Sequence, residues 1–299
     1  MWELVFPSDE APKTAENFLK RRYPIGYVRK LFRKSGVRVN GKRCRPREVL
    51  APGDVLQIFI PFEARARARE TGALEPKLDI VFENEELLVV NKAAGVAVHE
   101  GKGVRARDSL LAMAQAHLKR WGASPRLVHR LDRETSGLLV IAKNDSTAAE
   151  LEREFENRRV DKEYLALVVG ELRPSSGRIE LPLPGRDGRP VPALTLYSVE
   201  RRFAATTLAR VRIQTGRMHQ IRLHLARIGH PVVMDGQHGD FSFNKAFRKA
   251  HGLKRQFLHA AAIALTLRGR KWQWTAPLPA DLSAVLDALE AESEAGKLH

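Results

Sequence analysis

The chain has 299 residues, of which 43% are apolar, so it is long enough for two domains with a sizeable core. Its 51 Lys and Arg residues against 35 Asp and Glu residues give a net charge of +16, which favours a polyanionic partner, either nucleic acid or an anionic membrane surface. We expect a cytoplasmic protein with no membrane partner, because no apolar run approaches the roughly 20 residues that span a bilayer and no secretory signal is evident. Cys44 is the single cysteine, which excludes intramolecular disulfides and thiolate-rich zinc sites.

Two short helices are predicted near the N-terminus. Apolar residues recur at helical spacing over residues 14–22 and again over residues 25–34. Pro24 separates the two helices, because proline cannot continue a helix from within it. We expect Gly36 to end the second helix, because glycine readily adopts the left-handed conformation that closes a helix.

A hairpin is predicted after these helices. The Asn40-Gly41 pair follows alternating residues, which is the strongest short signal for a two-residue β-turn. Pro52-Gly53-Asp54 then predicts a turn into a strand over residues 55–60. Two small helices, a hairpin and a basic helical face resemble the S4 domain, a small RNA-binding module, over about residues 12–60. The resemblance implies a first domain, residues 1–62, that binds RNA.

The positive charge of the chain is concentrated in this segment. From Lys13 to Arg47 there are 13 basic residues and one acidic residue, Glu16, which is a net charge of +12 in 35 residues. A solvated charged face is the ordinary interpretation of such a run, but charges at this density repel one another unless phosphate groups neutralise them. The RNA contacts expected here come from Arg29, Lys30, Arg33, Lys34, Arg38, Lys42 and Arg43.

A second domain is predicted over residues 78–299. Residues 63–77 predict a linker before it, because they have no apolar periodicity. Strands and helices then alternate without a regular βαβ rhythm, which favours an α+β domain with a mixed or antiparallel sheet. Strands are expected at residues 78–82, 87–92, 137–143 and 163–169, and helices at residues 146–157 and 279–289.

One polar loop in the second domain is the strongest candidate for a chemical site. Residues 129–136 place seven polar or charged side chains between two apolar strands, where catalytic groups often lie. Asp132 could instead cap a turn in this loop. Asp132 and Glu134 could also form the carboxylate pair of a glycosidase, if several ångströms of space separated them across a sugar. Residue chemistry alone leaves these interpretations open.

Three motifs resemble one enzyme family. His129–Gly137 resembles the H-R-L-D-x-x-T-S-G signature of the RluA-type pseudouridine synthases. Residues 162–166 are similar to the K-x-Y-L-A strand of that family, and residues 215–224 to its T-G-R-x-H-Q-I-R-x-H segment. The matches occur in the order typical of the family and extend over about residues 78–278.

The resemblance implies a role for four residues. Asp132 would be the essential carboxylate, and Arg222 would pair with it and keep it ionised. Tyr164 would lie against the target base and relay or position the C5 proton. Arg130 would enter the space that the extruded uridine leaves in folded RNA. Whether Asp132 attacks the sugar or removes a sugar proton stays open at this point.

No cofactor and no metal are expected for this reaction, because it involves neither a redox change nor phosphoryl transfer. His219 and His224 are the only candidate ligands near the third motif, and their five-residue spacing is poor for a helical zinc pair. We also expect the protein to act as a monomer.

Four stretches bear on the choice of RNA. Residues 91–95 lack the proline of the N-K-P-x-G turn common in the family, and Met234 and His238 replace a common glycine and tyrosine. Residues 240–244 and 253–260 are most similar to the RluC branch, which acts on 23S ribosomal RNA. The S4 resemblance favours the same branch. The same chemistry on tRNA or another RNA, and a non-catalytic RNA-binding assembly factor, are the alternatives.

Overall fold

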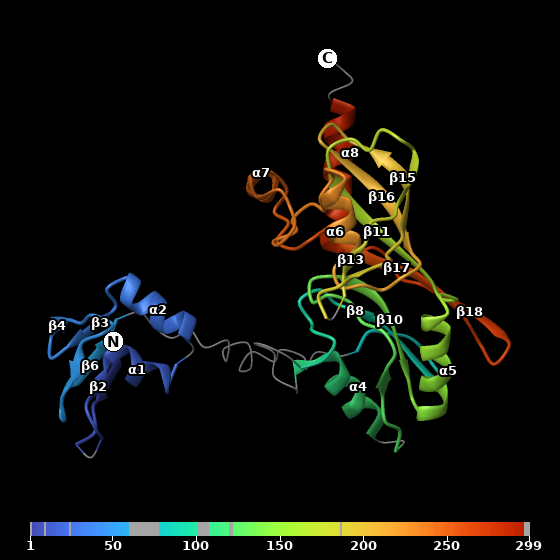
Figure 1. Cartoon of the computed structure of the whole chain (residues 1–299). Coiled ribbons are helices and arrows are strands. Elements are labelled where there is room, and N and C mark those ends of the chain that lie inside the picture. The colour runs from blue at the N-terminus through green and yellow to red at the C-terminus, as the bar shows by residue number, and fades with distance from the viewer. Residues whose placement is uncertain are drawn as a thin grey trace. The chain divides into compact units, whose positions relative to one another are not determined.

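The structure is a computed structural model that describes residues 2–8, 10–23, 25–59, 78–100, 108–119, 122–185 and 187–295. The chain forms two compact units, Met1–Glu75 and Pro76–His299 (Figure 1). The predicted linker over residues 63–77, like Pro24, lies outside the described residues. Within the described part of the chain, no helix is long and apolar enough to cross a membrane.

The N-terminal unit combines two helices with a four-stranded sheet. The sheet order is β1-β6-β3-β4, and β2 and β5 pair separately. Its core is a single cluster in which Phe6, Phe18 and Leu31 are fully buried. Its elements are β1 (Trp2–Val5), β2 (Lys13–Thr14), α1 (Ala15–Lys20), α2 (Ile25–Arg33), β3 (Val37–Val39), β4 (Lys42–Arg43), β5 (Val49–Leu50) and β6 (Val55–Ile58).

The local predictions for this unit are confirmed except at the end of α2. Both helices lie within their predicted ranges, and Asn40 and Gly41 form the hairpin turn with φ values of 49° and 79°. The prediction that Gly36 closes α2 in the left-handed conformation is wrong. Ser35 adopts that conformation, with φ 53°, and Gly36 instead donates its N–H to Leu31 O at 2.8 Å.

The C-terminal unit is built on one ten-stranded sheet. Eight strands follow the order β12-β15-β16-β11-β17-β10-β8-β7, while β18 pairs with β17 and β9 pairs with β10. The short strands β13 and β14 pair with each other outside this sheet. The strands are β7 (Ile80–Glu83), β8 (Leu87–Lys92), β9 (Arg126–Leu127), β10 (Ser136–Ala142), β11 (Asp161–Val169), β12 (Ser176–Ile179), β13 (Leu183–Pro184), β14 (Pro190–Val191), β15 (Thr195–Arg202), β16 (Thr206–Ile213), β17 (Leu258–Leu267) and β18 (Arg270–Thr275). The helices are α4 (Leu110–Leu118), α5 (Asp145–Glu156), α6 (Gln220–Arg227), α7 (Phe241–His251) and α8 (Ala280–Ala295).

The sheet is buried on both faces where it carries β8 and β10. Leu88 and Leu139 belong to one hydrophobic cluster, while Leu87 and Leu138 belong to another, because successive strand residues point to opposite faces. Helix α4 contributes to the first cluster and α5 to the second, and Figure 1 shows the two helices near this end of the sheet. Burial on both faces explains why these strands are continuous apolar runs in the sequence.

The sheet is mixed, as the sequence predicted. Among the described strands, β10 and β17 form the parallel pair, with Ser136 opposite His259 and Gly137 opposite Ala260. The neighbouring pairs are antiparallel, and β11 lies on the other side of β17, with Tyr164 opposite Ala260. Gly137, Ala260 and Tyr164 therefore lie in one row across three strands, next to the polar loop that precedes β10.

Gly137 permits the approach of β10 to β17. Its φ is +114°, which side chains rarely tolerate, and an added Cβ would lie 2.6 Å from Ala260 N and closer still to its carbonyl oxygen. Backbone atoms on a central strand cannot give way as a flexible side chain can. Glycine at this position is therefore a requirement of the strand pairing.

We predict that Gly137→Ala lowers the free energy of unfolding by at least about 3 kcal/mol, since it adds a backbone clash to an unfavourable φ. Gly269→Ala is the matched control, because Gly269 also has a positive φ of +72° but has open space around its Cβ position. The control should lose only about 1 kcal/mol. Urea denaturation of both variants measures the difference, and equal losses would contradict the packing argument.

Candidate active site

The polar loop predicted from the sequence joins β9 to β10. The two strands pair in antiparallel fashion, with Leu127 opposite Ile141. Asp132 lies in this loop. Its backbone carbonyl oxygen accepts a hydrogen bond from the backbone N–H of Thr135, with a distance of 3.1 Å between the nitrogen and the oxygen. The Asp132 side chain is 19% exposed, so a substrate can reach it.

His129 anchors the start of this loop. Its Nε2 accepts the backbone N–H of Val140 at 2.9 Å, and its ring stacks on Phe155 with the ring centroids 4.8 Å apart. Burial lowers the pKa of His129 to about 3, so the ring is neutral at physiological pH. The first residue of the motif therefore fixes the loop and takes no proton.

Lys92 fixes the other side of the loop and was not recognised from the sequence. Its side chain is buried, and its Nζ donates to the carbonyl oxygens of Ala93, Val96 and Arg133 at 2.9–3.1 Å. These bonds tie the loop to the end of β8. Burial lowers the pKa of Lys92 to about 7, while the charges of nearby Glu134 and Asp132 act in the opposite direction. A lysine at the end of an apolar strand was the available signal.

Arg222 brings Asp132 together with a second carboxylate. Its Nη1 donates to Asp132 Oδ2 at 2.9 Å, although the two residues are 90 positions apart in the chain. Its Nε and Nη2 donate to the two carboxylate oxygens of Asp235 at 2.6 and 2.8 Å. Only 6% of the Arg222 side chain is exposed, so α6 presents a nearly buried guanidinium between two carboxylates.

Asp235 is the permanent counter-ion in this arrangement. Its side chain is fully buried. Burial alone would raise the pKa of Asp235, but hydrogen bonds from Arg222 and from the N–H groups of Gln237 and His238 hold that pKa below its usual value. Asp235 lies between Met234 and His238, which the sequence analysis compared with the family pattern, but no sequence argument gave Asp235 a role, because its partner lies 13 residues earlier in the chain.

Tyr164 belongs to β11 and lies near Asp132. The register of β11 against β17 shifts just before it, because Glu163 pairs with Ala262 whereas Tyr164 pairs with Ala260. Burial, and then the negative charge of Asp132, raise the pKa of Tyr164. The phenol is therefore protonated at neutral pH and can donate a hydrogen bond.

A pair of histidines borders the same carboxylate. His219 Nε2 lies 3.8 Å from Asp132 Oδ1, and His219 Nδ1 lies 3.0 Å from His238 Nε2. Burial lowers the pKa of His219, while Asp132 opposes that shift. His224, the other histidine considered from the sequence, is fully buried and bonds Thr195 and Leu181. Within the described residues, no three His, Cys, Asp or Glu side chains gather as a metal site requires.

The structure shows how Met234 is accommodated where the family commonly has glycine. Its φ is 63°, the left-handed region in which glycine is most comfortable and which the family glycine suits. The strain is compensated locally, because Met234 is buried and its N–H donates to Asn244 Oδ1 at 2.7 Å. Position 234 can therefore carry a side chain without losing the turn that presents Asp235.

The predicted RNA-contacting residues have exposed side chains. Arg130 is exposed two residues before Asp132. The others lie on α2, β3 and β4 of the N-terminal unit. These exposed residues are Arg29, Lys30, Arg33, Lys34, Arg38, Lys42 and Arg43.

Comparisons with known proteins give consistent results. Residues 86–227 match the family model described as RNA pseudouridylate synthase. The ribosomal large subunit pseudouridine synthase C of Salmonella typhi is 34% identical over 97% of this chain and 97% of its own length. Its counterpart in Escherichia coli K12 is 35% identical over 89% of each chain. The solved structure of human RNA pseudouridylate synthase domain containing 4 matches with a TM-score of 0.61 and 26% identity, over 71% of this chain and 92% of that chain.

We predict that Lys92 makes stability rise with alkaline pH. The folded protein releases the Lys92 proton near pH 7 and the unfolded chain only near about pH 10, so the unfolded chain binds more protons between these values. The free energy of unfolding should therefore increase over this interval, and Lys92→Met should lack that increase. Urea denaturation across the interval measures it, with the exposed Lys271→Met as control. Parallel profiles for wild type and Lys92→Met would contradict the assignment.

Proposed function

The chain belongs to the RNA pseudouridylate synthase family, and from this premise we propose that it converts specific uridines of 23S ribosomal RNA to pseudouridine. As a member, it is an RNA pseudouridine synthase, an isomerase. The proposal for the substrate rests on the relatives named for the large ribosomal subunit, which align over nearly the whole chain. A ribosomal substrate implies action in the cytoplasm.

The observation that carries the proposed mechanism is the Asp132–Arg222–Asp235 arrangement. Asp235 already neutralises Arg222, so the bond from Arg222 to Asp132 orients the Asp132 carboxylate without binding it as a sole counter-ion. One Asp132 oxygen stays available for the ribose. Either attack on C1′ or removal of the C2′ proton needs an ionised carboxylate in that place.

The isomerisation breaks the N1–C1′ bond of uridine, turns the base and forms a C5–C1′ bond. The proton on C5 then leaves, and N1 gains one. Tyr164 acts in this last step as a hydroxyl that positions the base or relays a proton, because its raised pKa makes the phenolate scarce at neutral pH. The neighbouring His219 and His238 border the same space.

The N-terminal residues 1–62 act as an S4-like RNA-binding domain in this proposal. Exposed basic residues on α2 and on the β3–β4 hairpin supply phosphate contacts. Arg130 occupies the position of the extruded uridine and so offsets part of the cost of extrusion, which is a few kcal/mol.

We predict that Asp132→Asn folds and binds RNA but forms no detectable pseudouridine. The amide keeps the size and a hydrogen-bond acceptor for Arg222, but it removes the charge that acts on the ribose. Glu134→Gln is the matched control, because it neutralises an exposed carboxylate in the same loop and should keep activity. The measurement is pseudouridine mapping on 23S ribosomal RNA and bulk tRNA after incubation with each protein.

The outcomes of this mapping test the proposed substrate and the proposed role of Asp132 separately. New sites in 23S RNA with wild type and Glu134→Gln, but not with Asp132→Asn, support both substrate and mechanism. Sites confined to tRNA would overturn the substrate, and sites made by Asp132→Asn would overturn the mechanism. No modification by wild type in naked or ribosome-assembled RNA would overturn the catalytic function.

We also predict that the α2 variant R29Q/K30Q/R33Q/K34Q binds RNA with a weaker salt dependence. Each lost phosphate contact should reduce the slope of log affinity against log salt by about 1, so up to about four units would be lost. The charge-conserving variant R29K/K30R/R33K/K34R is the control and should retain the slope. Equal slopes for both variants would mean that α2 does not bind phosphate.

A further inference from the structure

The outward face of α7 carries an aromatic and three basic residues that the proposed site does not use. Phe241, Lys245, Arg248 and Lys249 are spaced by four, three and one residues, so they share one side of the helix. All four side chains are exposed, and Phe241 is 65% exposed. The helix contains no acidic residue, so nothing within it neutralises this face.

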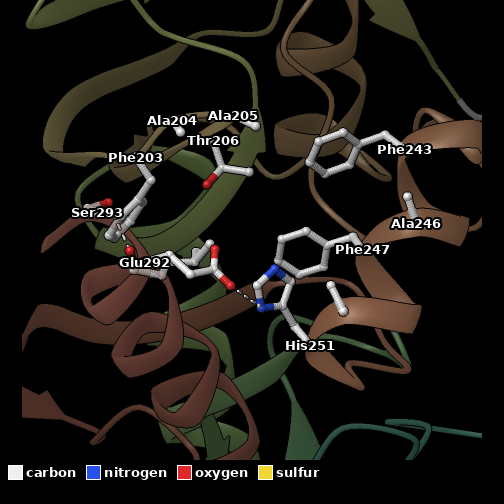
Figure 2. A pocket seen from close by; sticks show the side chains of 12 residues that line it. Phe203, Ala204, Ala205, Thr206, Phe243, Ala246, Phe247, His251, Glu292 and Ser293 are labelled. Carbon is white, nitrogen blue, oxygen red and sulfur yellow. Dashed lines mark hydrogen bonds and ion pairs between the residues drawn. The ribbon is translucent and has the colours of Figure 1, made fainter. Parts of the chain in front are cut away.

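The inward face of α7 joins a hydrophobic cluster in which Phe247 is buried together with Leu289 of α8, and Phe243 packs against this cluster. Phe243 and Phe247 stack with their ring centroids 5.6 Å apart, and Phe247 is buried. Both line a cavity of about 270 Å³ between α7, the β15–β16 turn and α8. Figure 2 shows the side chains that line it. His251 at the end of α7 faces Glu292 of α8, with His251 Nδ1 3.8 Å from Glu292 Oε1. These contacts fix the side of the helix that faces solvent.

Helix α7 is also tied to the carboxylates of the candidate site. Asn244 accepts the N–H of Met234 and donates from Nδ2 to Asp235 O at 2.9 Å. Asp235 in turn binds Arg222, which binds Asp132. Gly239 permits this contact, because a Cβ there would lie 2.8 Å from Asn244 Nδ2 and closer still to Asp235 O. The first turn of α7 is therefore positioned directly from the active site.

We propose that this face of α7 is a second RNA-binding surface, which holds the strand beside the target uridine. The inference rests on the proposed function for the nature of the partner. Lys245, Arg248 and Lys249 bind successive phosphates, and Phe241, at the end nearest Asp235, stacks on an unpaired base next to the extruded nucleotide. A strand held on both sides of the extruded uridine cannot easily close again over the vacated position.

The distribution of apolar residues favours RNA over a membrane surface. An amphipathic helix that binds lipid buries a broad apolar face in the bilayer. The apolar face of α7 is already packed against the protein through Phe247, and Phe241 is the one aromatic residue on the outward side. One exposed aromatic beside three cations suits a phosphate backbone with an unstacked base.

The test compares two charge-neutralising triple variants of the full chain. K245Q/R248Q/K249Q removes the α7 charges with a residue of similar helix propensity. R158Q/R173Q/K271Q is the matched control, because it removes three other exposed charges of the same unit. The affinity for a 23S ribosomal RNA fragment is measured by fluorescence anisotropy at several KCl concentrations. The α7 variant should lose about two to three units of salt slope and bind at least about tenfold more weakly, while the control should match wild type.

Phe241 is tested separately from the charges. Phe241→Ala should weaken binding of the same RNA by about tenfold with an unchanged salt slope, because stacking involves no counterion release. Phe241→Trp should restore the affinity. Since Phe241 is exposed, neither variant is expected to unfold the protein, and circular dichroism checks this.

The outcomes separate this inference from the proposed function. Equal slopes for the two triple variants would overturn the α7 surface. Binding of wild type to vesicles of anionic lipid that only the α7 variant loses, with RNA affinity unchanged, would overturn it in favour of a membrane. A slope difference supports the surface whether or not pseudouridine forms, so a lack of pseudouridine with wild type counts against the proposed function alone.

Discussion

The architecture of the site depends on one nearly buried guanidinium. A buried charge without a partner is costly, so Arg222 must be matched wherever α6 places it. Asp235, in the segment after α6, binds the guanidinium with both carboxylate oxygens. Asp132, in the β9–β10 loop, binds it through one oxygen. The β9–β10 loop is thereby brought to α6 and to the segment that follows α6, although Asp132 and Arg222 are 90 positions apart in the chain. The permanent pair of Arg222 and Asp235 leaves Asp132 as the carboxylate that can take part in chemistry.

The loop that carries Asp132 is fixed by backbone contacts as much as by charge. Lys92 binds the Arg133 carbonyl near one end of the loop and two carbonyl groups of the segment after β8, and His129 accepts a strand N–H at the other end. Gly137 allows β10 to approach β17 closely directly after the loop. Rigid attachment of this kind suits the proposed role of Asp132, because a carboxylate that is already held in place needs no ordering at the moment of reaction.

Much of the fold could be predicted from local patterns, whereas the site could not. The strands β8, β10 and β11 are apolar runs, and the Asn40–Gly41 turn has a strong local signal. Each of them could therefore be identified from a short stretch of sequence. Motif resemblance named Asp132, Tyr164 and Arg222, but the role of Asp235 depends on a tertiary contact that no periodicity reports. Ser35, not Gly36, closes α2, because the cap depends on which residue the chain can place in the left-handed region. Helix α7 was missed, although Asp240 as its N-cap and the Phe243–Phe247 spacing were visible.

The position of β17 has a consequence for synthesis. This strand lies between β10 and β11 in the sheet, yet its His259 follows Ser136 of β10 by 123 residues. Until it emerges from the ribosome, β10 and β11 each have an unpaired edge on the side that faces the other, which is a template for mispairing. The strands of the N-terminal unit all lie within its own residues, Met1–Glu75, so this unit does not wait for a strand from the C-terminal part of the chain. A nascent chain therefore completes its basic N-terminal unit well before its catalytic centre exists, and the sheet closes only when nearly all of the protein has been made.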